Sequence, residues 1–355
     1  APPRATGYNP ERLSEFHVSQ EVLGLAYSLG INRKTVDVLP SLHVSLRDMR
    51  LNNLTYKTNA YTKYTEELMT RYCKHLNKQS IMLKTSDEPG EGIIEYGSML
   101  GGEKIHLYRR YKNWTDIDTL LPDINNLNSK IPNKNFNIGG RSGGYWMDGL
   151  AGKKENRPTL IINGKPTASV DFPCSHLNLC YRHETGNWYQ EETYQELKAE
   201  GREYEDGYIV STKIDRALTK QMIQLMFNVK SKSAVSKLFN EWLRKEGSEE
   251  HNYNKLNSGY ETIEIQEEIL KHHYKIKDYF YKGKIAGQVI QWEEANLMFN
   301  IADQYIREHK ITTLTVHDEL IVQEEHQPLA REFMFTSGHN ETCSKYSVMS
   351  MIKDL

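Results

Sequence analysis

Two short stretches of this chain each place an aspartate beside a run of β-branched and apolar residues. Asp171 ends the run 167–172, and Asp318 lies between the runs 311–316 and 320–322. Such runs are typical of buried strands. Two strand-borne carboxylates that meet in space can hold a pair of magnesium ions about 3.5–4 Å apart, the arrangement used in phosphoryl and nucleotidyl transfer. The pair therefore predicts an enzyme that acts on nucleotides.

Two hairpins are expected to carry these aspartates. Residues 159–172 contain Asn163-Gly164 between two apolar runs, a strong signal for a two-residue hairpin turn. Residues 311–323 form a second hairpin, whose turn carries His317, Asp318 and Glu319. The two hairpins predict an antiparallel sheet that bears both carboxylates.

The rest of the chain is expected to be mainly helical. Apolar spacing and turn residues predict helices over 58–78, 175–184, 211–227, 233–246, 288–309 and 327–335, and a charged helical region over 189–202. They also predict a hairpin through 93–111 opened by the turn 88–92, a loop over 123–144 and a last strand over 346–352. The expected fold class is α+β, an antiparallel sheet interrupted by a mostly helical insertion.

Composition limits the setting of the protein. No run approaches the roughly 18 apolar residues of a membrane span, and the N-terminus lacks the apolar region of a secretory signal. The four cysteines form no CxxC pair, which favours buried thiols in a reducing, cytoplasmic compartment. The net charge of −2 argues against a histone-like nucleic-acid coat. Local basic clusters, such as Arg109-Arg110-Tyr111-Lys112, could still bind a strand, but a half-buried strand with a solvated basic face is the favoured interpretation.

A helix between the two aspartates carries candidate nucleotide-binding residues. Arg216 and Lys220 are one helical turn apart, and Phe227 or Asn228 returns to the same side of the helix. Two neighbouring cations could hold a triphosphate, and the later residues could meet the base or the sugar. Because Arg/Lys pairs at this spacing are common on exposed helices, the pair gains weight only from its place between the two hairpins.

A glycine-rich segment precedes the first hairpin. Residues 139–144 contain four glycines around Arg141 and Ser142. The glycines allow the backbone to approach a ligand closely, and the arginine is a donor for a phosphate or for a groove of nucleic acid. The alternative is a loop whose arginine is solvated.

The order of these motifs resembles that of the family A DNA polymerases and their relatives, the single-subunit phage RNA polymerases. The resemblance covers roughly residues 140–335, a little over half of the chain. Val-His-Asp-Glu-Leu at 316–320 is its most specific part and matches the third catalytic motif of the family residue for residue. Asp171 resembles the aspartate of the first motif, Arg216 and Lys220 match the Arg-x3-Lys of the fingers helix, and Arg141 matches the arginine of the Gly-Arg loop.

The resemblance implies a role for each residue. Asp171 and Asp318 would bind two Mg²⁺ ions, for which Mn²⁺ can substitute, and Phe172 would add its backbone carbonyl. One ion would activate the primer 3′-hydroxyl, and the other would escort pyrophosphate. Arg216 and Lys220 would neutralise the triphosphate. The primer terminus would be positioned by Arg141 and His317, with Glu319 as a local carboxylate of lesser role.

Two departures from the family pattern concern the choice of sugar. The position of the steric gate against ribose falls on His176, where the DNA polymerases carry glutamate and the RNA polymerases carry glycine. A bulky imidazole should crowd a 2′-hydroxyl, which favours deoxynucleotides. The tyrosine expected eight residues after Lys220 is replaced by Asn228, whose amide stacks poorly on a base and can hydrogen-bond a ribose.

The resemblance also implies a domain plan like a right hand. The regions are 1–135, a reduced thumb-like or template-binding lobe; 136–187, the first part of the palm; 188–285, the helical fingers insertion; and 286–355, the second part of the palm. About 135 residues before the Gly-Arg loop are too few for a proofreading exonuclease plus a thumb, so we expect none. A small polymerase of this kind suggests a virus, a plasmid or a mobile element, acting in the host cytoplasm.

The expected function is template-directed nucleotide addition to a 3′-hydroxyl. The expected partners are a DNA primer–template or an RNA/DNA hybrid and nucleoside triphosphates, with no membrane. An RNA polymerase or primase is the main alternative, and a non-catalytic nucleic-acid-binding relative is another. A His-Asp metal hydrolase would need further ligands, for which His251, His272 and His273 are available. The His-Asp pair of such enzymes normally lies on a helix, whereas here it follows a strand pattern.

Overall fold

The computed structural model describes residues 44–47, 53–54, 58, 60–84, 93–95, 107–112, 139–143, 154–189, 206–245, 249–336 and 349–353. Its strands are β1 (Val44–Arg47), β2 (Asn53–Leu54), β3 (Ile81–Lys84), β4 (Ile93–Glu95), β5 (Tyr108–Lys112), β6 (Gly139–Gly143), β7 (Leu160–Ile162), β8 (Lys165–Asp171), β9 (Leu314–Val316) and β10 (Glu319–Gln323). Its α-helices are α2 (Ala60–Leu76), α5 (Ser175–Thr185), α7 (Arg216–Asn228), α8 (Lys232–Lys245), α9 (Glu249–Ser258), α10 (Thr262–His272), α11 (Lys284–Gln304), α12 (Gln327–Thr336) and α14 (Ser350–Lys353). Shorter helical segments are η4 (Lys154–Thr159), η5 (Tyr274–Tyr279), η6 (Tyr305–His309) and η7 (Glu324–His326).

The described strands form two sheets. The larger has the order β4-β3-β7-β8-β10-β9, and each neighbouring pair in it is antiparallel. The smaller has the order β2-β1-β5-β6, with β1 and β5 parallel. The larger sheet carries Asp171 and Asp318 at one end of β8 and β10. A mixed α+β fold with an antiparallel sheet is therefore confirmed.

The first predicted hairpin forms as expected. Asn163 (φ 52°) and Gly164 (φ 75°) both take left-handed backbone conformations, as a tight two-residue turn requires. β7 and β8 pair on either side of this turn. The strand β10 is buried along its whole length and pairs with β8 on one side and β9 on the other. The aspartates consequently lie at the end of a rigid part of the sheet.

Helix α2 covers the β9 edge of the larger sheet. Its buried residues recur at helical spacing, among them Leu68, Tyr72 and Leu76. The Tyr72 hydroxyl donates to the carbonyl of Thr313 (2.8 Å) and accepts from the amide of Thr315 (3.1 Å). Because an uncovered edge strand leaves backbone groups unpaired, this contact closes the sheet on that side.

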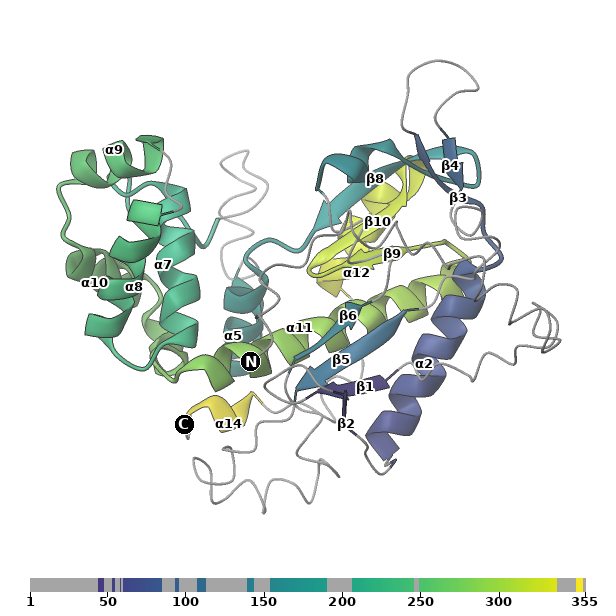
Figure 1. The fold of residues 1–355 in the computed structure, drawn as a ribbon, viewed down its shortest axis with the longest axis horizontal. Helices are drawn as coiled ribbons and strands as arrows, with labels where there is room; N and C mark the ends of the chain where they lie inside the picture. Colours follow the sequence, from purple (N-terminus) through teal and green to yellow (C-terminus); the bar gives the residue numbers. More distant parts are fainter. Residues whose placement is uncertain are drawn as a thin grey trace, which may run out of the picture.

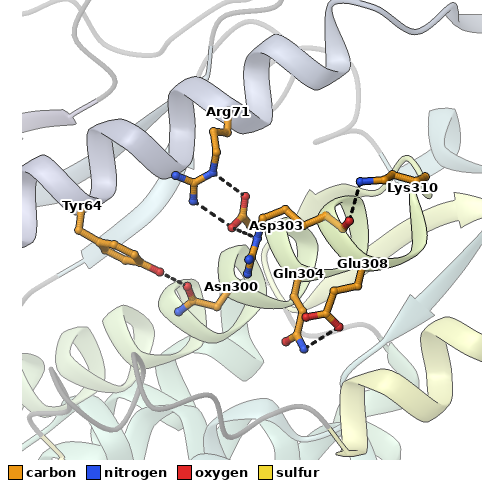
Figure 2. Close-up of polar contacts among 8 residues, drawn as sticks. Tyr64, Arg71, Asn300, Asp303, Gln304, Glu308 and Lys310 are labelled. Carbon is orange, nitrogen blue, oxygen red and sulfur yellow. Dashed lines mark hydrogen bonds and ion pairs between the residues drawn. The ribbon is translucent and has the colours of Figure 1, made fainter.

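Polar contacts fasten α2 to the C-terminal half of α11 (Figure 2). Arg71 donates from Nε and Nη2 to the two carboxylate oxygens of Asp303, at 3.2 and 3.0 Å. Tyr64 donates to the side chain of Asn300, one turn earlier on α11. A bidentate arginine–carboxylate pair fixes orientation as well as distance. These contacts set the position of the long helix against the rest of the fold.

Helix α11 runs through the centre of the molecule and contacts both sheets, α2, α5 and α7 (Figure 1). Almost all of its side chains from residue 289 to 303 are buried, so it lacks a solvent face over this length. A helix that is buried all round is a core helix. It contains buried polar groups as well, including Glu293, Glu294 and Asn296, and these need partners.

The helices α7, α8, α9 and α10 gather on one side of the molecule, with α5 and part of α11 between them and the larger sheet (Figure 1). The start of α7 is well defined, because the Asp215 carboxylate accepts from the amides of Ala217 (2.8 Å) and Leu218 (3.3 Å). This lobe falls within residues 188–285, the range expected for the fingers. Its role as fingers stays a prediction.

The predicted helices over 58–78, 175–184, 211–227, 233–246, 288–309 and 327–335 correspond to α2, α5, α7, α8, α11 with η6, and α12. Three local predictions were wrong. Residues 93–95 pair back with β3, and β5 joins the other sheet, so 93–111 is not one hairpin. Residues 139–143 form a strand within the predicted loop 123–144. Residues 350–353 form a helix where a strand over 346–352 was expected. Most of the predicted helical region 189–202 lies outside the described residues.

The first two errors share a cause. A strand's choice of partner depends on distant segments, which a local pattern does not report.

Within the part of the chain that the structure describes, no helix is both long and apolar enough to span a membrane.

Candidate active site

Asp171 and Asp318 lie at neighbouring positions of two paired strands. Asp171 is opposite Glu319 in the register of β8 and β10, and the Phe172 amide donates to the carbonyl of Asp318 at 2.8 Å. Standard strand spacing then puts the Cα atoms of the two aspartates about 6 Å apart. Asp171 is exposed and Asp318 is partly exposed. The two aspartates therefore occupy adjacent backbone positions, and both are accessible to solvent.

The turn between β9 and β10 holds the rest of the acidic motif. His317 has a φ of 56°, a left-handed conformation that is uncommon outside glycine and is seen at tight turns and functional sites. Partial desolvation by the surrounding chain, followed by the charge of Arg141, lowers the pKa of His317. Glu319 forms an ion pair with Arg157 of η4, which neutralises this third carboxylate.

Helix α5 begins directly beside the aspartates. Cys174, just before its first residue, has a φ of 52°, and this bend turns the chain from β8 into the helix. The hydroxyl of Ser175 lies within hydrogen-bonding distance of Asp318 Oδ2 (3.2 Å) and of Glu294 Oε2 (3.0 Å). Ser175 thus links the catalytic candidate on the sheet to the buried helix α11.

Glu294 is a further member of the site that the sequence analysis did not identify. Its residue is 1% exposed, and three side chains surround it. Arg141 of β6 donates to Oε1 from Nη2 (2.7 Å) and Nε (3.0 Å), and His176 Nε2 lies 3.1 Å from Oε2. Burial by itself would raise the pKa of Glu294, but the contact with His176 and the charge of Arg141 outweigh it and lower the pKa to about 2. The carboxylate is therefore ionised at neutral pH.

The predicted sugar gate, His176, lies between Glu294 and helix α7. Its ring meets the ring of Phe227 edge to face, with the centroids 6.1 Å apart. Phe227 is fully buried and packs on Phe280 as well. Phe227 therefore packs against the imidazole of His176 and has no exposed surface of its own. The side chain of His176 keeps 21% of its surface exposed.

Asn228 occupies a different position from Phe227. Its side-chain amide donates to the carbonyl of Gln224 at 2.7 Å. The same side chain lies so close to α11 that a Cβ atom built on Gly287 would be 2.2 Å from its Oδ1. Asn228 is thus held between α7 and α11.

Arg216 and Lys220 share one aromatic neighbour, as expected for residues one turn apart on α7. The Arg216 guanidinium lies 5.3 Å, and Lys220 Nζ lies 5.7 Å, from the ring centroid of Tyr208. Both cations are exposed, whereas Tyr208 is buried. The cations are attracted to the face of the ring, so Tyr208 gathers two positive charges at the start of the lobe.

Asp206 holds one of these cations. Its carboxylate forms an ion pair with Arg216 and accepts from the Cys174 thiol (3.4 Å) and the Tyr208 amide (2.9 Å). Because Cys174 directly precedes α5, this network joins the basic pair to the segment that follows Asp171. The sequence analysis missed Asp206 and Tyr208, since nothing in their local pattern separates them from an ordinary loop.

β5 is a partly buried strand, as the favoured interpretation of its sequence expects, but Arg109 does not lie on an exposed basic face. Arg109 is 2% exposed and donates to the carbonyl of Gly140 and to the Asn296 side chain, both at 2.7 Å. Tyr111 is fully buried. Neither residue can stack on a nucleic-acid strand in this arrangement, so the less favoured interpretation of this segment is wrong for both. Their role is to pack β5 against α11.

The three histidines of the hydrolase alternative do not gather around Asp318. His273 is buried and contacts Tyr181 and the carbonyl of Gly207, and burial lowers its pKa to about 3. His272 contacts Tyr189, and His251 stacks on Trp242. These contacts give all three histidines structural roles.

The donor set of the site suits a hard cation. Among the described residues, no group of three or more acidic, histidine or cysteine side chains could hold a metal ion by itself. Mg²⁺ is commonly bound by one or two carboxylates together with waters and substrate phosphates. Asp171, Asp318 and the Phe172 carbonyl would supply the protein's share of such a site.

No family model, curated protein or solved structure matches this chain. We therefore infer the function from the motifs and from the geometry of the residues themselves.

Proposed function

We propose that this protein is a template-directed nucleotidyltransferase, a small DNA polymerase that extends a 3′-hydroxyl. The observation that carries the proposal is the register of β8 and β10. It puts Asp171 and Asp318 at one end of the sheet, next to the Phe172–Asp318 backbone hydrogen bond. Both carboxylates belong to motifs whose order resembles that of the family A DNA polymerases.

The surrounding charges support nucleotide chemistry. Asp171, Asp318 and the Phe172 carbonyl would hold two Mg²⁺ ions, which supply the charge that stabilises the attacking and leaving oxygens. The exposed Arg216 and Lys220 would bind the triphosphate of the incoming nucleotide. Asp206 currently pairs with Arg216, so a triphosphate would compete with that carboxylate for the guanidinium.

The remaining site residues would contact either the primer terminus or the sugar of the incoming nucleotide. Arg141 and His317 would position the primer terminus. Glu319, which pairs with Arg157, would be a local carboxylate of lesser role. His176 would crowd a ribose 2′-hydroxyl, and Asn228 would contact the nucleotide from the end of α7. The partly exposed imidazole, supported by buried Phe227, favours discrimination by shape.

In this proposal the larger sheet with α5 and α11 is the palm of a right hand, and helices α7–α10 are the fingers. Residues 1–135 would contain a thumb-like or template-binding region. The substrates would be a primer–template and deoxynucleoside triphosphates. We propose a cytoplasmic setting, within the host if the source is a virus.

The decisive experiment is extension of a labelled DNA primer–template with Mg²⁺, comparing deoxynucleotides with ribonucleotides. The test variant is Asp318→Asn, and the matched control is Glu324→Gln. Both changes neutralise a carboxylate beside β10, but Glu324 is exposed at the opposite end of the strand. We expect templated extension by the wild type and by the control, and a loss of at least about 10³-fold in Asp318→Asn, because a two-metal site without one carboxylate cannot hold both ions.

The other outcomes separate the alternatives. Extension with ribonucleotides, or synthesis without a primer, would indicate an RNA polymerase or primase. Binding of the primer–template without incorporation would make the protein a non-catalytic relative and would refute the proposal. Equal activity of Asp318→Asn and the wild type would remove Asp318 from the chemistry.

A further inference from the structure

Glu294 is a buried charge held by groups from three separate elements. It lies on α11, Arg141 comes from β6, and Ser175 and His176 come from the first turn of α5. Gln291, one turn earlier on α11, also faces Arg141, and with its amide oxygen turned toward the guanidinium it accepts from Nε and Nη1 at 3.1 Å. The guanidinium is thus held by two residues of the same helix.

Stability alone gives a weak reason for such a charge. Moving a carboxylate into a protein interior costs several kcal/mol, and well-packed apolar residues often stabilise a fold equally well or better. What a buried charged cluster supplies is a fixed geometry, since the hydrogen bonds that Arg141 and Ser175 donate to Glu294 are directional. The partners of Glu294 are two of the residues assigned to sugar choice and primer position.

We propose that Glu294 is a positioning residue that determines the sugar specificity of this enzyme by holding the imidazole of His176. This inference rests on the proposed function. His176 is confined on two sides, by the Glu294 carboxylate 3.1 Å from Nε2 and by the buried Phe227 ring, which lies at 82° to the imidazole. Without the carboxylate, the imidazole can rotate away, and the space beside the sugar opens.

The same carboxylate couples the sugar gate to the primer side of the site. Glu294 Oε1 accepts from Arg141, and Oε2 accepts from Ser175 and lies 3.1 Å from His176 Nε2. The Ser175 hydroxyl is also 3.2 Å from Asp318 Oδ2. Loss of the charge therefore affects two functions at once. We expect the ratio of kcat/KM for deoxynucleotides to kcat/KM for ribonucleotides to change more than kcat/KM for deoxynucleotides itself. Of the nucleotide, His176 would contact only the sugar, and Arg141 would keep Gln291 as a partner.

The test is steady-state primer extension by Glu294→Gln, with kcat/KM measured separately for a deoxynucleotide and the matching ribonucleotide. We expect kcat/KM for the deoxynucleotide divided by kcat/KM for the ribonucleotide to fall about tenfold, the change expected when one charge-assisted contact is lost. Glu293→Gln is the matched control. It removes the neighbouring buried charge on the same helix and should leave the ratio unchanged.

A double-mutant cycle distinguishes positioning from a general loss of structure. In a His176→Ala background the gate is already absent, so Glu294→Gln should not change the ratio further. If Glu294→Gln does not fold, Glu294→Asp keeps the charge but is one methylene too short to reach both Arg141 and His176, and it should lower the ratio as well.

Several results would overturn the inference. An unchanged ratio in a folded Glu294 variant would do so, as would an equal change in Glu293→Gln or a full effect in the His176→Ala background. These failures differ from a failure of the proposed function, in which the wild type itself incorporates neither kind of nucleotide.

Discussion

The buried carboxylate of Glu294 should make a measurable, pH-dependent contribution to stability. Its residue is 1% exposed and lies between Arg141 and His176. Glu294→Gln keeps the shape of the side chain and removes its charge. The comparison of the two proteins therefore isolates the ionic contribution from the packing contribution.

The magnitude follows from the pKa of Glu294. Burial opposes ionisation, but the contact with His176 and the charge of Arg141 lower the pKa from 4.5 to about 2. At about 1.4 kcal/mol for each pKa unit, this difference corresponds to about 3 kcal/mol of folding free energy. Because the folded-state pKa lies below the unfolded one, the stabilisation is complete above about pH 4.5 and is lost as the pH falls toward about 2.

The assay is urea denaturation of both proteins at pH 7 and at several values between pH 5 and 2. We expect Glu294→Gln to be less stable by about 3 kcal/mol at pH 7, and the difference to shrink as the pH falls, because protonated glutamate resembles glutamine. A difference of less than about 0.5 kcal/mol at pH 7, or one that stays constant down to pH 2, would refute this account of the ion cluster.

Two further changes test other parts of the site. Gly140→Ala should destabilise the protein by about 2–4 kcal/mol in thermal or urea unfolding, because its Cβ would lie 2.8 Å from Arg109 Nη2 at a φ of +78°. Gly164→Ala, at a φ of +75° with open space around it, should cost only about 1–2 kcal/mol, and an equal effect at both glycines would contradict the predicted clash. Asp206→Asn should lower the KM for the nucleoside triphosphate about threefold at low salt, because it releases Arg216 from its ion pair. A raised KM would show instead that Asp206 positions the guanidinium for binding.

Local patterns predicted the elements that carry the aspartates. The Asn163-Gly164 turn defines the β7–β8 hairpin because both positions need a left-handed backbone. The spacing of apolar residues predicted α2, and the four-residue step between Arg216 and Lys220 put both cations beside one ring. The turn, the helix and the shared side of Arg216 and Lys220 depend on neighbours in the sequence, which therefore determines them, whereas the ring that the two cations meet, Tyr208, comes from outside the helix.

The tertiary structure alone decided which distant groups meet. Arg109 lies in a basic, aromatic stretch and Arg141 in a glycine-rich one, and neither pattern indicates a partner. In the fold, Arg109 is buried against Asn296, whereas Arg141 reaches Glu294. The pairing of β4 with β3, and of β5 with β6, also depends on segments far apart in the chain.

Glu294 is the clearest case. In the sequence it is one of two adjacent glutamates in a helix, a pattern that usually indicates a solvated face. No local signal marks Glu294 as buried, because other polar residues, such as Gln288, Gln291 and Asn296, recur around the same helix. Which partners neutralise the charge was settled only when β6 and α5 packed against α11, because a buried carboxylate must find its donors wherever the fold brings them.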